Sequence, residues 1–474
     1  MSLLIRNKFL LLLTFIAIAH LLNFHFRNVP MISDEGGYAY AAKFWSSNYR
    51  LYQDILIDRP QGIFLIYKFI FLFTQSTSGI RVFSTLSQSL CAYLIFYISK
   101  SITTPRKALL SALIFQIFIV SPRIEGFSAN AEIFTMPMIL ISTILSKKHK
   151  WFWTSITAAL AFIIKPIGLS SLLFGILWST YIYFPDKKII LKTYLTITVA
   201  FILGITPFIA HMFYSTSTNK YLWIFIDKAK TDSIFSFNYL FFTKFIHSAI
   251  LTISAWITPL ILSFVALKNI SKPNQLFLLL FFFTSLIGMS IGGNWFLHYY
   301  TQIIPTLSIL CGLGITIIYQ NLVNNKNITK NLLFLTIIVA TLIDLSRFYF
   351  MTPYQISWNL YHRPSYILHE PISQYISQNS SPNDTLFIAF SDAQLYYSNN
   401  RMAATTYLYW TNFTNSSQIQ EEVATTLKHQ KPTLIIETLD PTTKSNYPNI
   451  AKNWNDNYQF DKSISVEITD YSNN

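Results

Sequence analysis

The sequence predicts a mainly α-helical, polytopic membrane protein with a small α/β domain at its C-terminal end. Of its 474 residues, 52% are hydrophobic and only 12% are charged, whereas a soluble chain carries about a quarter charged residues. Eleven segments are apolar enough to cross a bilayer, and Lys and Arg recur in alternate loops between them. After about residue 350, polar runs alternate with short strand-like segments. We therefore expect a transmembrane domain at 1–350 and a soluble domain at 351–474.

The first expected span, 8–24, follows basic residues and precedes no small-residue cleavage motif, so we interpret it as an uncleaved helix. A helix needs roughly 20 residues to cross a bilayer, with some tolerance for shorter ones. The other expected spans are 81–98, 107–120, 132–146, 151–165, 167–184, 190–213, 243–266, 274–291, 302–319 and 331–350.

The positive charges indicate how the chain is oriented. A net charge of +14 would suit a nucleic-acid partner, but the excess lies largely in short loops beside apolar spans, where it is an orientation signal instead. With a cytoplasmic N-terminus, the positive loops 99–106, 147–150, 185–189, 267–273 and 320–330 all lie inside. The segments 25–80, 121–131, 214–242 and 292–301, and everything after about 350, then lie outside.

Two segments of the first outer loop are predicted to be helical without crossing. Counting the apolar residues 63–75 as a span would reverse every later loop against the positive-inside rule, so they dip in or lie at the interface. Residues 37–47 are amphipathic. They could lie along the membrane surface or pack on the bundle as an ordinary loop helix.

The C-terminal region carries three strand-like segments, at 385–390, 433–438 and 463–468. Both cysteines, Cys91 and Cys311, fall within apolar spans. The sequence therefore supports neither a disulfide framework nor a thiolate metal site.

Polar residues in the first outer loop are the first candidates for chemistry. Asp34 and Glu35 are adjacent acids followed by Gly36 and Gly37, which suggests a carboxylate where the backbone approaches another group closely. A helix start with Ser33 or Asp34 as N-cap would also explain them. Acids beside a bilayer are costly, however, and are usually kept for function.

Further candidates lie in or next to segments expected outside. Asp58 and Arg59 could form a neutral structural bridge, or Arg59 could grip a phosphate through paired donors. Glu132 opens a helix, where the dipole favours a carboxylate in any case. Lys165 could extend to the headgroups or hold a lipid phosphate. His298 and its tyrosines could be no more than an aromatic belt.

As a set, these residues resemble the GT-C type polyprenyl-phosphate-sugar-dependent glycosyltransferases. The resemblance is to the bacterial branch related to dolichyl-phosphate-mannose–protein mannosyltransferases and aminoarabinose–lipid A transferases. The sequence departs from that pattern where a single Pro60 precedes Gln61, because the family has paired prolines there. The matching motifs are Asp34-Glu35, Asp58-Arg59-Pro60, Asn130-Ala131-Glu132, Lys165-Pro166, Gly292 through Pro305, and Asp392 through Arg401.

The resemblance implies an inverting glycosyltransferase on the outer face of the cytoplasmic membrane, acting in cell-envelope synthesis. It would move a sugar from a polyprenyl-phosphate donor to a glycan, glycolipid or protein hydroxyl. Asp34 and Glu35 would be catalytic residues, and Asp34 would be the general base. Arg59, Lys165, Arg123 and His298 would bind the donor phosphate, and Asp58, Asn130, Glu132 and Tyr299 would position the substrates. No metal or other cofactor would be required, although a divalent ion between Asp34 and Glu132 is compatible with the pattern.

Other functions remain alternatives at this stage. A transporter or flippase of a lipid-linked saccharide would place ionisable residues within broken spans, and Asp344 is the one plausible example. A polymerase or ligase of lipid-linked oligosaccharides would share the donor type. A non-catalytic scaffold would leave the acids of the outer loops unexplained.

Overall fold

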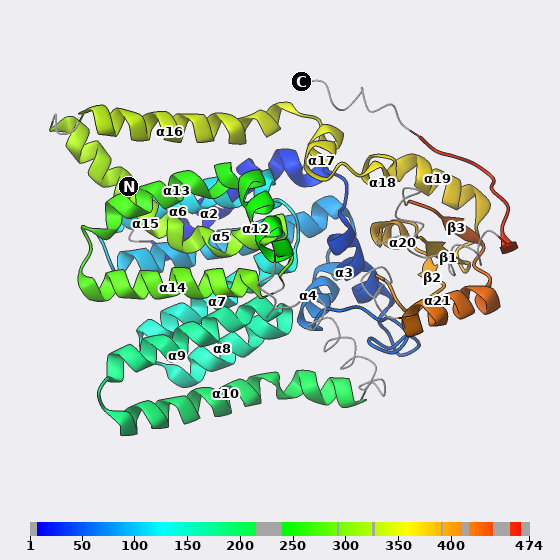
Figure 1. Cartoon of the computed structure of the whole chain (residues 1–474), viewed down its shortest axis with the longest axis horizontal. Coiled ribbons are helices and arrows are strands. Elements are labelled where there is room, and N and C mark those ends of the chain that lie inside the picture. The colour runs from blue at the N-terminus through cyan, green and yellow to red at the C-terminus, as the bar shows by residue number, and fades with distance from the viewer. Residues whose placement is uncertain are drawn as a thin grey trace.

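The computed structural model describes residues 7–214, 239–291, 293–324, 328–389, 392–409, 417–438 and 456–465. Long helices lie side by side in a bundle, and a smaller α/β part lies beyond one end of it, next to α3 and α4 (Figure 1). The predicted fold class, a polytopic helical membrane protein with a small α/β part, is therefore confirmed. Most of the outer loop expected at 214–242, and Gly292, lie outside the described residues.

The helices of the bundle coincide well with the predicted spans. The first group is α2 (Lys8–Asn23), α5 (Thr77–Lys100), α6 (Pro105–Ile119), α7 (Ala131–Lys147), α8 (Trp151–Ile164), α9 (Leu169–Tyr183) and α10 (Lys187–Tyr214). The second group is α12 (Tyr239–Leu251), α13 (Ile253–Leu267), α14 (Lys272–Ser290), α15 (Ile304–Val323) and α16 (Ile328–Arg347). Seven helices in the described part of the chain are long and apolar enough to cross alone, so the number eleven stays a prediction.

The span predicted at 243–266 is not one continuous helix. Helix α12 meets α13 at an angle of 87°, and the break falls at Thr252. The hydroxyl of Thr252 donates to the Ser248 carbonyl at 2.8 Å and accepts from the Trp256 indole at 3.1 Å. A side-chain hydroxyl that takes a backbone carbonyl competes with the regular helix ladder. Hydropathy alone does not register such a break.

The first outer loop contains two helices, α3 (Ser33–Phe44) and α4 (Gly62–Phe71). Ten residues of helix reach only about 15 Å, so α4 is too short to span, as predicted for residues 63–75. In α3, every residue from Glu35 to Ala42 is buried. Of the two alternatives for residues 37–47, the structure therefore supports the packed loop helix and excludes the one lying on the membrane surface.

The C-terminal part contains α17 (Pro353–Tyr361), α18 (Pro364–Ile367), α19 (His369–Asn379), α20 (Gln394–Ser398) and α21 (Ser417–Gln430). Its parallel sheet has the order β2-β1-β3, with β1 (Thr385–Ile388) between β2 (Met402–Ala403) and β3 (Leu434–Ile436). The first two predicted strands are thus confirmed. Of the third, residues 463–465 are not in a strand, and the remainder lies outside the described residues.

Helix α20 packs directly on α3, and glycine permits this approach. A Cβ atom on Gly36 would lie 2.3 Å from the Cα of Gln394, and one on Gly37 would lie 1.7 Å from the Tyr409 hydroxyl oxygen. No Cβ fits at either distance. The close backbone approach suggested by the two glycines is confirmed, and its partner is the C-terminal part of the chain.

We expect Gly36→Ala to destabilise the protein by about 1–3 kcal/mol, the usual cost of overpacking, although alanine normally favours a helix. Thermal unfolding of the purified protein would measure this. Gly175→Ala is the matched control, since its Cβ would meet only side-chain atoms at 3.1 Å or more, the Thr154 methyl group at 3.1 Å and the Ser146 Oγ at 3.6 Å. Equal unfolding temperatures for the two variants would contradict the packing described here.

Candidate active site

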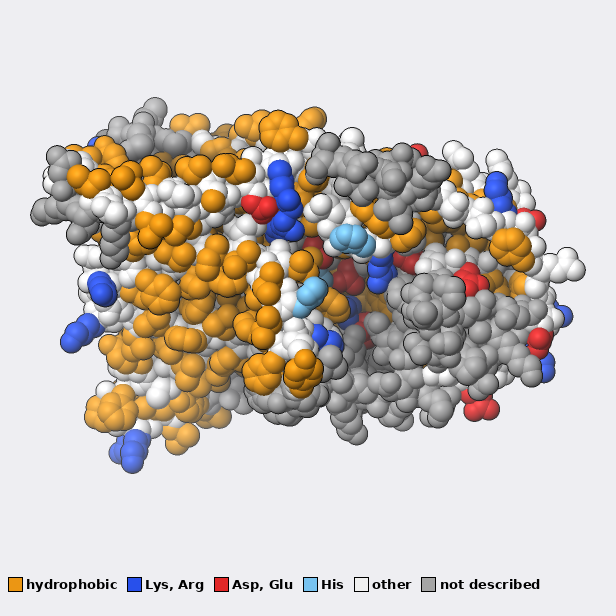
Figure 2. All heavy atoms as spheres, turned by 45° about the horizontal axis from the view of Figure 1, so that its top comes forward, with side chains coloured by type: hydrophobic (Ala, Val, Ile, Leu, Met, Phe, Trp, Pro, Cys, Tyr) orange, Lys and Arg blue, Asp and Glu red, His pale blue; other side chains and the backbone are white. Residues whose placement is uncertain are grey.

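The site lies between the end of the bundle and the C-terminal part, where Figure 2 shows a hollow containing acidic, basic and histidine side chains. Five of the predicted residues converge here from separate segments. Asp34 lies in the first turn of α3 and Glu132 in the first turn of α7. Arg59 precedes α4, Lys165 joins α8 to the short helix η3 (Pro166–Gly168), and His298 lies in η4 (Leu297–Gln302).

Asp34 lies between two cationic side chains. Its Oδ1 is 3.9 Å from Nη2 of Arg59, and its Oδ2 is 4.0 Å from Nε2 of His298. The Asp34 side chain is 23% exposed, whereas those of Asp58 and Glu132 are fully buried. Asp34 is therefore the most accessible of these three carboxylates.

Arg59 is fixed by the acid that precedes it. Nη1 of Arg59 lies 2.7 Å from Oδ2 of Asp58, and the Tyr52 hydroxyl donates to the Arg59 carbonyl at 2.9 Å. Of the two alternatives for this pair, the structural bridge is observed, and the phosphate-binding role of Arg59 stays a prediction. Asp58 forms the structural bridge, and the bridge holds the guanidinium of Arg59 beside Asp34.

Lys165 reaches the site because Pro166 follows it. A residue before proline is disfavoured in the helical region, and Lys165 is extended, with φ −155° and ψ 141°. This ends α8 and turns the chain into η3. Lys165 forms a buried ion pair with Oε1 of Glu132, and its ammonium lies 4.8 Å from the centre of the Tyr299 ring. The second Glu132 oxygen, Oε2, is buried without a hydrogen-bond partner among the described residues.

His298 lies between Asp34 and Arg59 on one side and Glu132 and Lys165 on the other. These five residues form the Asp34 cluster. Nε2 of His298 lies 3.5 Å from Oε1 of Glu132, and its Nδ1 lies 2.9 Å from Oε2 of Glu125. Burial alone would lower the pKa of His298, but the carboxylates of Glu132 and Glu125 outweigh it and raise that pKa above 6.5. The imidazole is thereby favoured in its charged form, facing Asp34.

Glu125 was not among the predicted site residues. It follows η2 (Pro122–Ile124) in the left-handed region, with φ 52°, and accepts a hydrogen bond from Nδ2 of Asn130 at 3.1 Å. The second outer loop contains this acid, but no spacing rule pairs it with a histidine 173 positions later. Asn130, predicted to position substrate, instead supports the histidine's partner.

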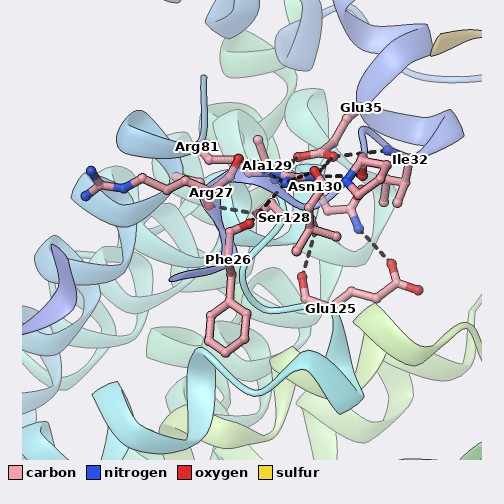
Figure 3. Close-up of polar contacts among 12 residues, drawn as sticks. Phe26, Arg27, Ile32, Glu35, Arg81, Glu125, Ser128, Ala129 and Asn130 are labelled. Carbon is pink, nitrogen blue, oxygen red and sulfur yellow. Dashed lines mark hydrogen bonds and ion pairs between the residues drawn. The ribbon is translucent and has the colours of Figure 1, made fainter. Parts of the chain in front are cut away.

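The catalytic role expected for Glu35 does not agree with its surroundings. Its carboxylate is fully buried and binds Nε and Nη2 of Arg81 at 3.0 and 2.6 Å. It also accepts the backbone N–H of Ala129 at 2.7 Å and that of Ile32 at 3.3 Å (Figure 3). Such a fully engaged carboxylate has little capacity to accept a substrate proton, so Glu35 is a structural residue that orients the start of α3.

Arg81 also binds the backbone of the segment that leads from α2 into α3. Its Nη1 donates to the carbonyls of Phe26, Arg27 and Val29 at 3.2, 3.3 and 2.5 Å. The same guanidinium therefore holds the residues after α2 and the acid next to Asp34. Arg81 was predicted only as the first residue of a span, because a linear pattern does not reveal which groups a buried arginine joins.

Arg123 does not join the Asp34 cluster as expected. Its Nη2 lies 3.3 Å from Oδ1 of Asp344, which is also 3.2 Å from Nε of Arg347. Asp344 lies near the end of α16, and the charges of Arg123 and Arg347 balance its own. The phosphate-binding role expected for Arg123 is thus not supported, because η2 directs Arg123 to α16 while Glu125 turns to His298.

The C-terminal part contributes contacts that sequence patterns did not reveal. The Tyr366 hydroxyl accepts the N–H of Ser33 at 3.1 Å, and the Tyr409 hydroxyl donates to the Ser33 carbonyl at 2.9 Å. Burial and the Asp34 carboxylate raise the pKa of Tyr409 well above 10.0, so its hydroxyl stays protonated. Two tyrosines thus clamp the residue that precedes Asp34.

Comparisons with known proteins identify the fold. No protein-family model and no curated protein sequence matches the chain. Two crystal structures of ArnT from Cupriavidus metallidurans, one bound to undecaprenyl phosphate and one in the apo state, each match with a TM-score of 0.59. Each match has 14% sequence identity and covers 91% of this chain and 93% of the ArnT chain. ArnT is an aminoarabinose–lipid A transferase of the GT-C type, so the resemblance drawn from the motifs is confirmed at the level of the fold.

Proposed function

We propose that the protein is an inverting glycosyltransferase that takes a sugar from a polyprenyl phosphate and transfers it to an acceptor hydroxyl. The observation that carries this proposal is the position of Asp34, an accessible carboxylate between Arg59 and His298. A base placed beside cations suits a reaction in which a hydroxyl loses a proton while a phosphate leaves. Support also comes from the fold, since an ArnT structure holds undecaprenyl phosphate.

The cations would bind the donor phosphate and stabilise it as it leaves. The guanidinium of Arg59 is held by Asp58, and Lys165 by Glu132. Because these partners fix the side chains before substrate arrives, little reorganisation is needed as charge develops on the leaving group. The positive charges of Arg59, Lys165 and His298 would stabilise the leaving phosphate. We propose that no metal ion is required.

The transfer would be a single displacement. A carboxylate oxygen of Asp34 accepts the proton of the acceptor hydroxyl, whose oxygen forms the new bond to the anomeric carbon. The bond from that carbon to the phosphate oxygen breaks, and the electron pair leaves with the polyprenyl phosphate. Attack opposite the leaving group inverts the anomeric centre.

We propose that the site faces the outer side of the cytoplasmic membrane, that the N-terminus is cytoplasmic, and that residues 351–474 form a soluble domain outside. The acceptor is a glycan, glycolipid or protein with a free hydroxyl. The alternative function as a flippase depended on Asp344 as an ionisable residue within a span. Because Arg123 and Arg347 balance the charge of Asp344 near a helix end, this alternative is weakened.

Donor binding tests the phosphate assignment. We expect Arg59→Ala to weaken the affinity for a polyprenyl-phosphate sugar by about 10- to 100-fold, since a hydrogen bond to a charged group contributes about 1.5–3 kcal/mol. Binding can be measured by titrating the labelled lipid into detergent-solubilised protein. Arg50→Ala, an exposed arginine in the same loop, is the matched control. A wild-type affinity in Arg59→Ala would refute the role of Arg59.

The His298 assignment predicts a pH dependence. If the charged imidazole assists the leaving phosphate, activity is high below the pKa of His298 and falls as pH rises through it. That midpoint should lie above 6.5, since the neighbouring carboxylates raise the pKa. Profiles of kcat/KM against pH for the wild type and His298→Gln would show it. If the kcat/KM of His298→Gln still falls at the same alkaline pH, a group other than His298 causes the fall.

A further inference from the structure

A second polar cavity, of about 400 Å³, lies apart from the Asp34 cluster. Its lining comes from the segment 27–31, Lys43 of α3 and the start of α5 on one side, and from α17, α19 and α20 on the other. All the residues that line it are described by the structure. The cavity thus lies at the seam between the bundle and the C-terminal part, and carbonyls of the segment 27–31 that lines it accept hydrogen bonds from Arg81.

The lining of the cavity carries more positive than negative charge. It includes two permanent cations, Arg27 and Lys43, and one carboxylate, Glu370. Lys43 contacts the Tyr397 ring at 5.3 Å, and Arg27 donates to Nδ1 of His20 at 2.5 Å. The described residues place no carboxylate at ion-pair distance from either cation, and Nε of Arg27 is buried without a hydrogen-bond partner.

Further donors face the same space. Helix α5 begins here, and the first N–H groups of a helix lack partners within it and favour an anion. Ser76 caps one of them, at Gly79, which leaves those of Thr77 and Ser78 beside the cavity. In the part of the chain that the structure describes, Nδ1 of His369 is buried without a hydrogen-bond partner. Burial, partly offset by Glu370, lowers the pKa of His369 below 6.5. A neutral histidine can still donate a hydrogen bond.

The cavity borders a surface suited to lipid. Leu72 and Phe73, just before α5, are 76% and 67% exposed, and Leu21 and Phe24, near the end of α2, are 76% and 70% exposed. Such large apolar side chains belong in a hydrocarbon environment in a membrane protein. The donors next to them are then at the height of the headgroups.

We propose that this cavity binds the phosphate of an anionic membrane phospholipid. Lys43, the α5 N-terminus and His369 would hold the headgroup, while its acyl chains would lie along the exposed apolar residues nearby. Because the two walls come from the bundle and from the C-terminal part, the bound lipid would connect them. The site is separate from the Asp34 cluster and does not depend on the reaction proposed there.

Native mass spectrometry of the full-length protein, titrated with phosphatidylglycerol, tests the proposal. We expect one tightly bound lipid in the wild type and about tenfold weaker binding in Lys43→Gln, as for loss of a charged hydrogen bond. His369→Ala is a second variant that weakens the same site, and Lys268→Gln, an exposed lysine outside the cavity, is the control. Unfolding temperatures would verify that each variant is folded.

Three results would overturn the assignment. One is equal phosphatidylglycerol affinity in the wild type, Lys43→Gln and His369→Ala. Another is equal binding of phosphatidylcholine with the same chains, since a cationic site should prefer the anionic headgroup. The third is displacement of the lipid by millimolar inorganic phosphate, which would identify a site for the free anion and not for a lipid.

Discussion

Replacing Asp34 with asparagine is expected to abolish sugar transfer while the protein still folds and inserts normally. General base catalysis contributes about 10²- to 10⁴-fold to a rate, and an amide cannot accept the hydroxyl proton. Asp34 is partly exposed, its carboxylate oxygens lie 3.9 Å from Arg59 and 4.0 Å from His298, and asparagine has nearly the same size and shape as aspartate. We therefore expect kcat to fall by at least about 100-fold and the unfolding temperature to change little.

Two control variants sharpen this result. Asp34→Glu keeps the base but displaces it, and should retain more activity than Asp34→Asn. Glu421→Gln removes an exposed carboxylate from α21 and should have wild-type turnover. Full turnover by Asp34→Asn would remove the assigned base and, with it, the mechanism.

The second large effect is expected at Arg81, and it is an effect on stability. Arg81→Ala would leave the fully buried Glu35 carboxylate without its cation and free several backbone carbonyls. Breaking a buried ion pair by removing one partner costs about 3–5 kcal/mol. We expect Arg81→Ala to unfold at a much lower temperature than the wild type, or to be recovered poorly from membranes.

The double variant Glu35→Gln, Arg81→Met separates the structural role from a catalytic one. Replacing both partners removes the unpaired charge, so much of the lost stability should return, and activity should return with it. If instead Glu35→Gln alone unfolds like the wild type but has no activity, Glu35 takes part in the chemistry and the structural assignment is wrong.

The sequence was sufficient to predict the helical architecture, because hydropathy and the positions of Lys and Arg depend on local composition. Through motifs that resemble a known family, it also assigned Asp34, Glu132 and Lys165 to one reaction, and the structure brings these residues together around His298. The sequence did not predict the bend at Thr252, which lies within a continuous apolar stretch.

The sequence patterns mainly failed to predict which groups the buried charged side chains contact. Glu35 and Asp34 are neighbours in sequence, yet the first turn of α3 directs one to Arg81 and the other to Arg59. Glu125 and Arg123 diverge in the same way, to His298 and Asp344. The contacts of Tyr366 and Tyr409 with Ser33 depend on how the C-terminal part packs on α3. A linear pattern contains none of this information.

Mass spectrometry of lipids that co-purify with the Asp34→Asn protein tests the central claim most directly. A protein that binds the donor but cannot remove the acceptor's proton should retain a polyprenyl phosphate still carrying its sugar. That lipid should be depleted when Arg59→Ala or Lys165→Ala is added. Recovery of ordinary phospholipids alone, or of the same isoprenoid lipid in undiminished amount from the double variants, would contradict the account.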